Sequence, residues 1–137
     1  MTLVLDSSVA LTWCFEDEGT VATDAVLDQV AHSGAAAPLL WPLEILNALT
    51  MAERRGRIDA SQRQRLSGFL RDLPVALDGE TAIQAWVATA SLAAQFRLTI
   101  YDAAYLELAV RMRLPLATLD RELRAAADKL GVVLLGQ

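Results

Sequence analysis

Short apolar runs alternate with longer segments of helical periodicity along the whole chain, and this alternation limits the folds that the chain can adopt. The apolar runs contain few polar residues, which is typical of strands that are buried on both faces. Such strands, when joined by helices, form a parallel sheet with helices on both sides. The sequence therefore predicts an α/β fold, a three-layer α/β/α sandwich with a parallel central sheet.

Local signals set the boundaries of the predicted elements. Ser7 or Ser8 is the expected N-cap after the first strand, Pro42 suits a first helical turn, and Gly56 suits a helix end. The predicted strands are 2–5, 35–39, 75–77, 114–118 and 132–135. The predicted helices are 9–15, 20–31, 42–55, 61–73, 80–96, 102–112 and 121–129. Since the chain has 137 residues and no linker or repeat, we expect one domain over 1–137.

The composition indicates a protein with more apolar surface than its own core needs. Hydrophobic residues make up 54% of the chain and charged residues 21%. The longest apolar stretch, 35–43, is interrupted by Pro38 and Pro42, so no membrane span is predicted. The N-terminal residues lack an export signal, and a cytoplasmic protein is expected. The surplus apolar surface is available to a partner or to a second copy.

The side chains that could hold a transition metal are scarce. Cys14 is the only cysteine and His32 the only histidine, which excludes an internal disulfide and a thiolate cluster for zinc. A bound metal must therefore be held by oxygen atoms.

The net charge of −5 opposes the binding of long nucleic acid by bulk electrostatics. A local exception is a stretch rich in arginine, whose guanidinium groups could contact phosphates bidentately. The simpler interpretation of the stretch is a solvated helical surface. Its members are Arg54, Arg55, Arg57, Arg63, Arg65 and Arg71.

Four acidic residues are predicted to meet at one edge of the sheet. Asp6 ends the first strand and Asp120 follows the fourth, and the carboxyl ends of parallel strands line the crevice where ligands bind. Glu44 falls in the first turn of the helix after the second strand, and Asp102 opens another helix.

Each acid also has a structural explanation. Asp6 could close an Asx turn, Asp120 could cap the following helix, and Asp102 could complement a helix N-terminus. Glu44 is harder to explain in this way, because it stands among apolar residues, where an unpaired carboxylate would take up a proton or find a cation. These explanations account for each acid but not for their common location.

Mg²⁺ or Mn²⁺ with oxygen ligands would relieve the repulsion among the four carboxylates and could activate a phosphodiester for hydrolysis. No histidine or lysine base is then needed, and His32 and Lys129 both lie outside the predicted pocket. Ser7, Asn47 and Thr118 are candidate donors to the carboxylates, with capping and helix packing as the alternative.

Four segments resemble PIN-domain ribonucleases and, more narrowly, the VapC toxins of bacterial type II toxin–antitoxin modules. They are LDSSVA at 5–10, PLEILNAL at 42–49, TIYDAAY at 99–105 and LATLDREL at 116–123. The resemblance covers essentially the whole chain in the right order, and each family acid has a match in Asp6, Glu44, Asp102 and Asp120.

The resemblance implies a sheet in the order 3-2-1-4-5 and a Mg²⁺- or Mn²⁺-dependent endoribonuclease in which these four acids bind metal and catalyse RNA cleavage. It also implies a homodimer and a cognate antitoxin whose tail crosses an apolar groove. Ordinary core packing is the stronger expectation for Trp86 and for at least one of the candidates for the groove. Candidates for the groove are Trp13, Cys14, Phe15 and Trp41.

Three other functions remain open. A receiver-like phosphoacceptor domain would need paired acids after the first strand, whereas Asp6 is followed by Ser7. A catalytically silent binding module is disfavoured by four intact acids. A DNA-directed nuclease of the same fold is compatible with the sequence.

Overall fold

The central element of the molecule is a five-stranded sheet, seen in a computed structural model that describes residues 1–137. Its strand order is β3-β2-β1-β4-β5, and every neighbouring pair is parallel, as predicted. The strands are β1 (Val4–Leu5), β2 (Ala35–Pro38), β3 (Val75–Asp78), β4 (Leu116–Ala117) and β5 (Leu134–Leu135).

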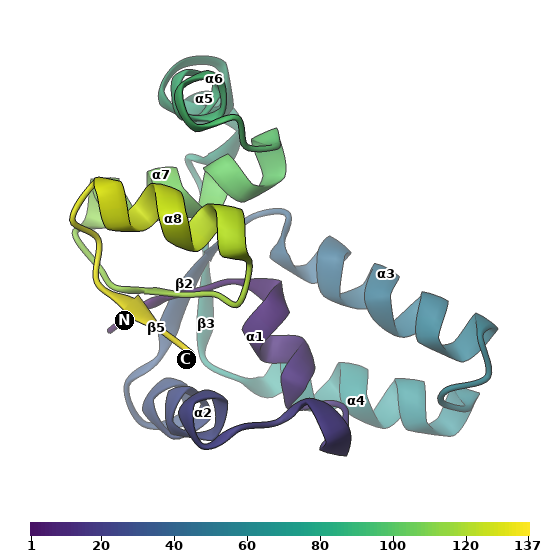
Figure 1. Cartoon of the computed structure of the whole chain (residues 1–137). Helices are drawn as coiled ribbons and strands as arrows, with labels where there is room; N and C mark the ends of the chain where they lie inside the picture. Colours follow the sequence, from purple (N-terminus) through teal and green to yellow (C-terminus); the bar gives the residue numbers. More distant parts are fainter.

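Helices cover the sheet on both sides. In Figure 1, α7 and α8 lie above the strands, α2 lies below them, and α3 and α4 form a hairpin to one side. The helical segments are α1 (Ser7–Thr12), η1 (Glu16–Glu18), α2 (Val21–Ser33), α3 (Trp41–Arg54), α4 (Ala60–Asp72), α5 (Thr81–Gln84), η2 (Ala85–Thr89), α6 (Ala90–Phe96), α7 (Ile100–Met112) and α8 (Arg121–Lys129). The result is the predicted α/β/α sandwich.

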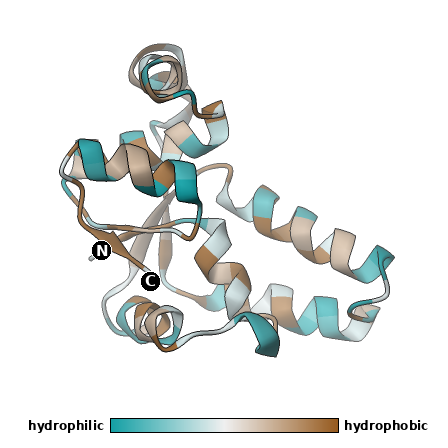
Figure 2. Ribbon diagram, in the orientation of Figure 1, coloured by the Kyte–Doolittle hydropathy of each residue, from teal (hydrophilic) through white to brown (hydrophobic).

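The core is built from the strands and from the helix faces turned toward them. Leu3, Val4 and Leu5 are fully buried, and α7 is buried continuously from Ala103 to Ala109. Burying one large aliphatic side chain contributes about 1.5–3 kcal/mol. Figure 2 shows the strands in hydrophobic colours and the outer side of α8 in hydrophilic ones. This apolar centre fixes the strands and so fixes the edge at which they end.

Strand register brings two distant chain segments together at that edge. Leu5 of β1 is paired with Ala117 of β4. Because the strands are parallel, the residues that follow them, Asp6 and Thr118, leave the sheet at the same edge.

The segment 80–96 differs from the single helix that we predicted. The chain begins its helix at Thr81 and passes through a π-helical turn, η2, before α6. The segment packs on α7 rather than on the sheet, so only one narrow face, with Thr89 and Ala93, is buried. The prediction that Trp86 lies in the core is wrong, since its side chain is 88% exposed.

The element boundaries shift elsewhere by a few residues. The first and last two strands are shorter than predicted, and α1 ends at Thr12 rather than at Phe15. Asp6, not Ser7 or Ser8, stands at the N-cap of α1, and it makes no side-chain capping bond. None of the helices combines the length and hydropathy needed to cross a bilayer.

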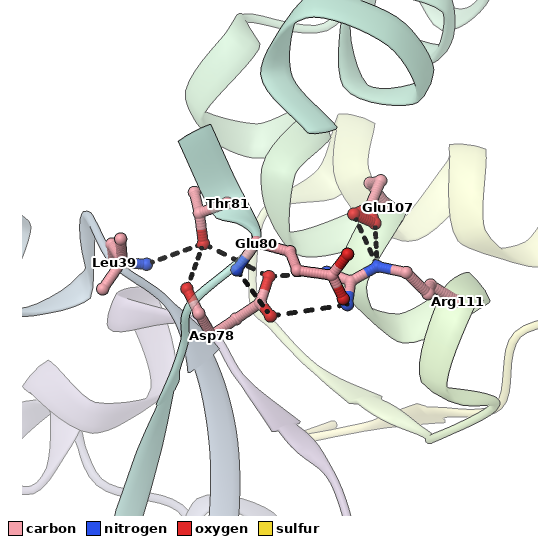
Figure 3. Close-up of polar contacts among 6 residues, drawn as sticks. All are labelled: Leu39, Asp78, Glu80, Thr81, Glu107 and Arg111. Carbon is pink, nitrogen blue, oxygen red and sulfur yellow. Dashed lines mark hydrogen bonds and ion pairs between the residues drawn. The ribbon is translucent and has the colours of Figure 1, made fainter. Parts of the chain in front are cut away.

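A polar network centred on Arg111 joins α7 to the end of β3 (Figure 3). The Arg111 guanidinium donates to Asp78 at 2.5 Å, to Glu80 at 3.2 Å and to Glu107 at 3.0 Å. Thr81 donates to the Asp78 carbonyl and accepts from the backbone N–H of Leu39. The network thus ties the turn before α3 and the start of α5 to the helix that carries Asp102.

Candidate functional site

Asp6 is the most enclosed of the four acids, with only 4% of its surface exposed. Its extended backbone follows β1, and its Oδ2 atom accepts hydrogen bonds from Ser8 and Thr118, each at 2.7 Å. Burial raises the pKa of Asp6, the two hydroxyls oppose this rise, and the charge of Asp120 adds to it. The two hydroxyls therefore hold the carboxylate in place. Its negative charge, however, is not balanced by a cationic side chain.

Glu44 reaches the same region from the first turn of α3. Its Oε1 atom accepts hydrogen bonds from the Tyr105 hydroxyl at 2.5 Å and from the Ser7 hydroxyl at 3.3 Å. Ser7 also lies 3.5 Å from Oδ1 of Asp6 and so bridges the two acids. Burial raises the pKa of Glu44, and the nearby charge of Asp6 raises it further.

Asp102 and Asp120 occupy the starts of two helices. Thr99 caps α7, which puts Asp102 in its first turn, and Asp120 caps α8 by accepting from the N–H of Leu123 at 2.8 Å. Partial burial, followed by the charges of Asp120, Asp6 and Glu44, raises the pKa of Asp102 to about 6.

The structure therefore brings Asp6, Glu44 and Asp120 within electrostatic range of Asp102. None of them forms a salt bridge, since every ion pair in the protein involves other carboxylates. No three Asp, Glu, His or Cys side chains lie close enough to form a closed metal cage. The acids share a neighbourhood without a preformed set of ligands.

The donor chemistry of this neighbourhood suits a divalent cation. All the candidate ligands are carboxylate oxygens, the type that Mg²⁺ and Mn²⁺ prefer. Glu44 Oε2 and Asp120 Oδ2 accept no hydrogen bond from the protein, so these oxygens are available to a cation. Burial is the main cause of the raised pKa values of Asp6, Glu44 and Asp102, and the like charges of neighbouring acids raise them further.

The family model described as the PIN domain matches residues 3–129 of this sequence. The chain belongs to the PIN domain family. PIN domains are generally metal-dependent nucleases, and the four carboxylates at the acidic edge are the candidate groups for such chemistry in this chain.

A solved structure shares the fold of this PIN domain. It is the crystal structure of PAE2754 from Pyrobaculum aerophilum, with a TM-score of 0.72 and 24% sequence identity, over 98% of this chain and 89% of that one. No curated protein matches the chain. The receiver-like alternative is excluded, because receivers place their strands in the order 2-1-3-4-5.

The predicted supporting residues have different positions in this PIN domain. Ser7 and Thr118 contact the acids directly. Asn47 is exposed and makes no side-chain hydrogen bond, so the structure does not bring it to the acids.

The arginine-rich stretch is partly neutralised by acids within the protein. Arg57 pairs with Asp17 at 2.7 Å, and Arg63 pairs with Glu53. These two side chains belong to the surface of the α3–α4 hairpin, as the simpler interpretation of the stretch expected.

Two contacts of the PIN domain site were absent from the sequence prediction. Ser8 was considered only as a helix cap, but its hydroxyl donates to Asp6 and accepts from the backbone N–H of Leu119. No role is predicted for Tyr105 from the sequence. Tyr105 lies three residues after Asp102, so the two side chains lie on one face of the predicted helix. This spacing could have identified Tyr105 as a residue near the acids.

Proposed function

We propose that this PIN domain is a Mg²⁺- or Mn²⁺-dependent endoribonuclease and the toxin of a toxin–antitoxin pair, acting in the cytoplasm. The observation that supports this most is the meeting of Asp6, Glu44, Asp102 and Asp120 at one sheet edge with no cationic side chain to neutralise them. A site that is only structural would pair such acids with Arg or Lys, as the Arg111 network does.

In this proposal the four carboxylates would hold the cation, which when bound would supply Lewis-acid activation of a phosphodiester and of a water molecule. Ser8 and Thr118 keep Asp6 at the end of β1. The Ser7 hydroxyl lies between Asp6 and Glu44 and contacts both carboxylates. Asp120 accepts a hydrogen bond from the backbone N–H of Leu123 in the first turn of α8. Glu44 and Asp102 thus lie in first helical turns, and Asp6 and Asp120 are the N-cap residues that open α1 and α8.

RNA rather than DNA is proposed as the substrate because the four sequence segments resemble the toxin ribonucleases of the family. A DNA-directed nuclease of the same fold is the competing candidate. A silent binding module is less consistent with four acids that remain unpaired.

The test is a cleavage assay on structured RNA, unstructured RNA and single-stranded DNA. We expect cleavage of RNA that EDTA stops and excess Mn²⁺ restores. Asp6→Asn and Asp102→Asn should each reduce the rate by at least about 100-fold, because each removes a charge from the cation site.

Asp28→Asn is the matched control, since Asp28 is an exposed acid of α2 that makes no hydrogen bond or ion pair. It should cleave like the unmodified protein. Cleavage that persists in EDTA, or that survives both site substitutions, would remove the basis of the proposal. Cleavage of DNA alone would favour the competing nuclease.

The antitoxin is proposed to bind a groove between η1 and α4. Phe15, Ile58 and Phe69 give the groove apolar walls, and the Arg57 guanidinium lies 3.9 Å from the centre of the Phe15 ring. An amphipathic tail could bury apolar side chains there. Of the residues predicted to line the groove, Cys14 and Phe15 do so. Trp13 instead donates to the Thr23 carbonyl, and Trp41, the first residue of α3, is buried and lines a separate pocket between α3 and α4. A short adjacent gene with a DNA-binding N-terminus would support this partner.

A homodimer is proposed as the assembled form. Ile83, Trp86 and Val87 are 67%, 88% and 68% exposed on neighbouring turns of α5 and η2. An apolar face of this kind is typical of a surface that a second copy covers.

A further inference from the structure

Tyr105 is a fully buried aromatic residue whose one polar atom is used at the candidate site. Its side chain has no exposed surface, and its hydroxyl donates to Oε1 of Glu44 at 2.5 Å. The bond links α7 to α3 across 61 residues of sequence. Asp102 lies three residues before Tyr105, so one helix supplies both an acid and the contact that holds another.

Glu44 would not be fixed without such a contact. It has several rotatable bonds, and its neighbours Leu43 and Leu46 are 72% and 44% exposed, so the helix face beside it is open to solvent. Fixing a long side chain of this type costs about 1–2 kcal/mol of rotamer entropy. A charge-assisted hydrogen bond from a buried donor opposes that loss.

The two hydrogen bonds to Glu44 end on the same oxygen. Both Tyr105 and Ser7 donate to Oε1, while Oε2 accepts nothing from the protein. The carboxylate is thereby held at one oxygen and left available at the other.

We propose that Tyr105 is a positioning residue for a divalent cation: its hydroxyl fixes Glu44 Oε1, so that Oε2 is the oxygen presented to the cation. This inference rests on the proposed function, because it requires that the acids bind a metal. Tyr105 would act on the cation only through Glu44 and would not contact the cation itself.

The chain contains a matched control. Tyr101 stands one turn earlier on α7, is 64% exposed and makes no side-chain hydrogen bond. Tyr105→Phe and Tyr101→Phe therefore each remove one tyrosine hydroxyl from α7. Only the Tyr105 hydroxyl contacts Glu44.

The experiment measures Mn²⁺ binding to the full chain by calorimetry and by the electron paramagnetic resonance signal of free Mn²⁺. Tyr105→Phe should weaken binding by about 10-fold or more, as outer-shell substitutions commonly do. Tyr101→Phe should bind like the unmodified protein. In a Glu44→Gln background, Tyr105→Phe should add no further loss, because the group through which it acts is already changed. Ser7→Ala removes the longer bond to the same oxygen and also the contact with Asp6, so it should give a smaller loss, part of which persists in the Glu44→Gln background.

The possible results separate this inference from the proposed function. If the unmodified protein binds Mn²⁺ and Tyr105→Phe binds it equally well, the role of Tyr105 is refuted and the metal site stands. Equal losses with Glu44 and with Gln at position 44 would also refute it, because they indicate a general effect on packing. If the unmodified protein binds no Mn²⁺, the proposed function fails, and the role of Tyr105 fails with it. A Tyr105→Phe protein that does not fold, as judged by circular dichroism, would also refute the inference, because the hydroxyl would then be needed for the fold rather than only for placing Glu44.

Discussion

At the scale of single residues, the site contains carboxylates whose charges are not balanced by the protein. Asp6 is buried with two hydroxyl donors, and Asp102 is half-buried with three like charges nearby. Hydroxyl donors stabilise a carboxylate less than an ion pair does, so the charged forms remain costly. Their unbalanced charges therefore lower the stability of the folded protein.

The pKa of Asp102 gives a prediction about stability and pH. Because this pKa is about 6 in the folded protein and 3.8 ordinarily, the folded state binds the proton more tightly. The free energy of unfolding should then fall as pH rises from about 4 to about 6. Asp102→Asn removes the charge, so in EDTA it should be more stable than the unmodified protein at pH 8 by about 1 kcal/mol, after allowing for solvent screening of the half-exposed side chain.

The measurement is urea denaturation in EDTA at pH 4, 6 and 8. The gain from Asp102→Asn should be present at pH 8 and should disappear at pH 4, while Asp28→Asn should change nothing at any pH. A substituted protein that is less stable at pH 8 would show that Asp102 is held by favourable contacts instead.

At the scale of elements, α7 is the helix on which the site depends. It packs on β1, β2 and β4, its first turn carries Asp102, and its second carries Tyr105. Its last turn is joined by Arg111 to Glu107 and to Asp78 at the end of β3. Glu107 and Asp78 are almost fully buried at the side chain, with 5% and 11% exposed, and so depend on this single cation. The helix is thus fixed at both ends relative to the sheet.

Loss of the Arg111 network should destabilise the protein strongly. Arg111→Ala leaves two buried carboxylates without a partner and should lower the free energy of unfolding by about 2–3 kcal/mol. Arg63→Ala breaks the pair with Glu53, in which each side chain is 34% exposed, and should cost less than about 1 kcal/mol. Urea denaturation at pH 7 compares the two. Similar small losses would mean that the Arg111 network is as weak as a surface pair.

At the scale of the whole molecule, the α5–η2–α6 segment lies outside the sandwich. It packs on α7, whereas α7 itself packs on the strands of the sheet (Figure 1). Its outer face presents Ile83, Trp86 and Val87 to solvent. Such a face gives a monomer no stability, because its apolar area stays in water.

Trp86→Asp should therefore separate the proposed homodimer without unfolding the subunit. Trp and other aromatic residues commonly dominate interface energy, and the substitution should weaken dimerisation by about 30-fold or more. Analytical ultracentrifugation over a concentration series gives the measurement. Val21→Asp is the control, since Val21 is 89% exposed on α2, away from this face. A monomeric unmodified protein, or a fully dimeric Trp86→Asp, would contradict the assignment of this face.

The sequence by itself determined the sheet and the location of the acids. Buried strands show as apolar runs, and parallel strands end at one edge, so Asp6 and Asp120 could be placed there from local pattern alone. Glu44 and Asp102 followed because a helix start after a strand is also a local feature.

Only the tertiary structure decided which side chains touch. Thr118 donates to Asp6 across 112 residues, and Tyr105 donates to Glu44 across 61. Trp86 is exposed because its helix packs on another helix rather than on the sheet. Local periodicity reports which face of an element is apolar, whereas the neighbour of that face depends on how all the elements pack together.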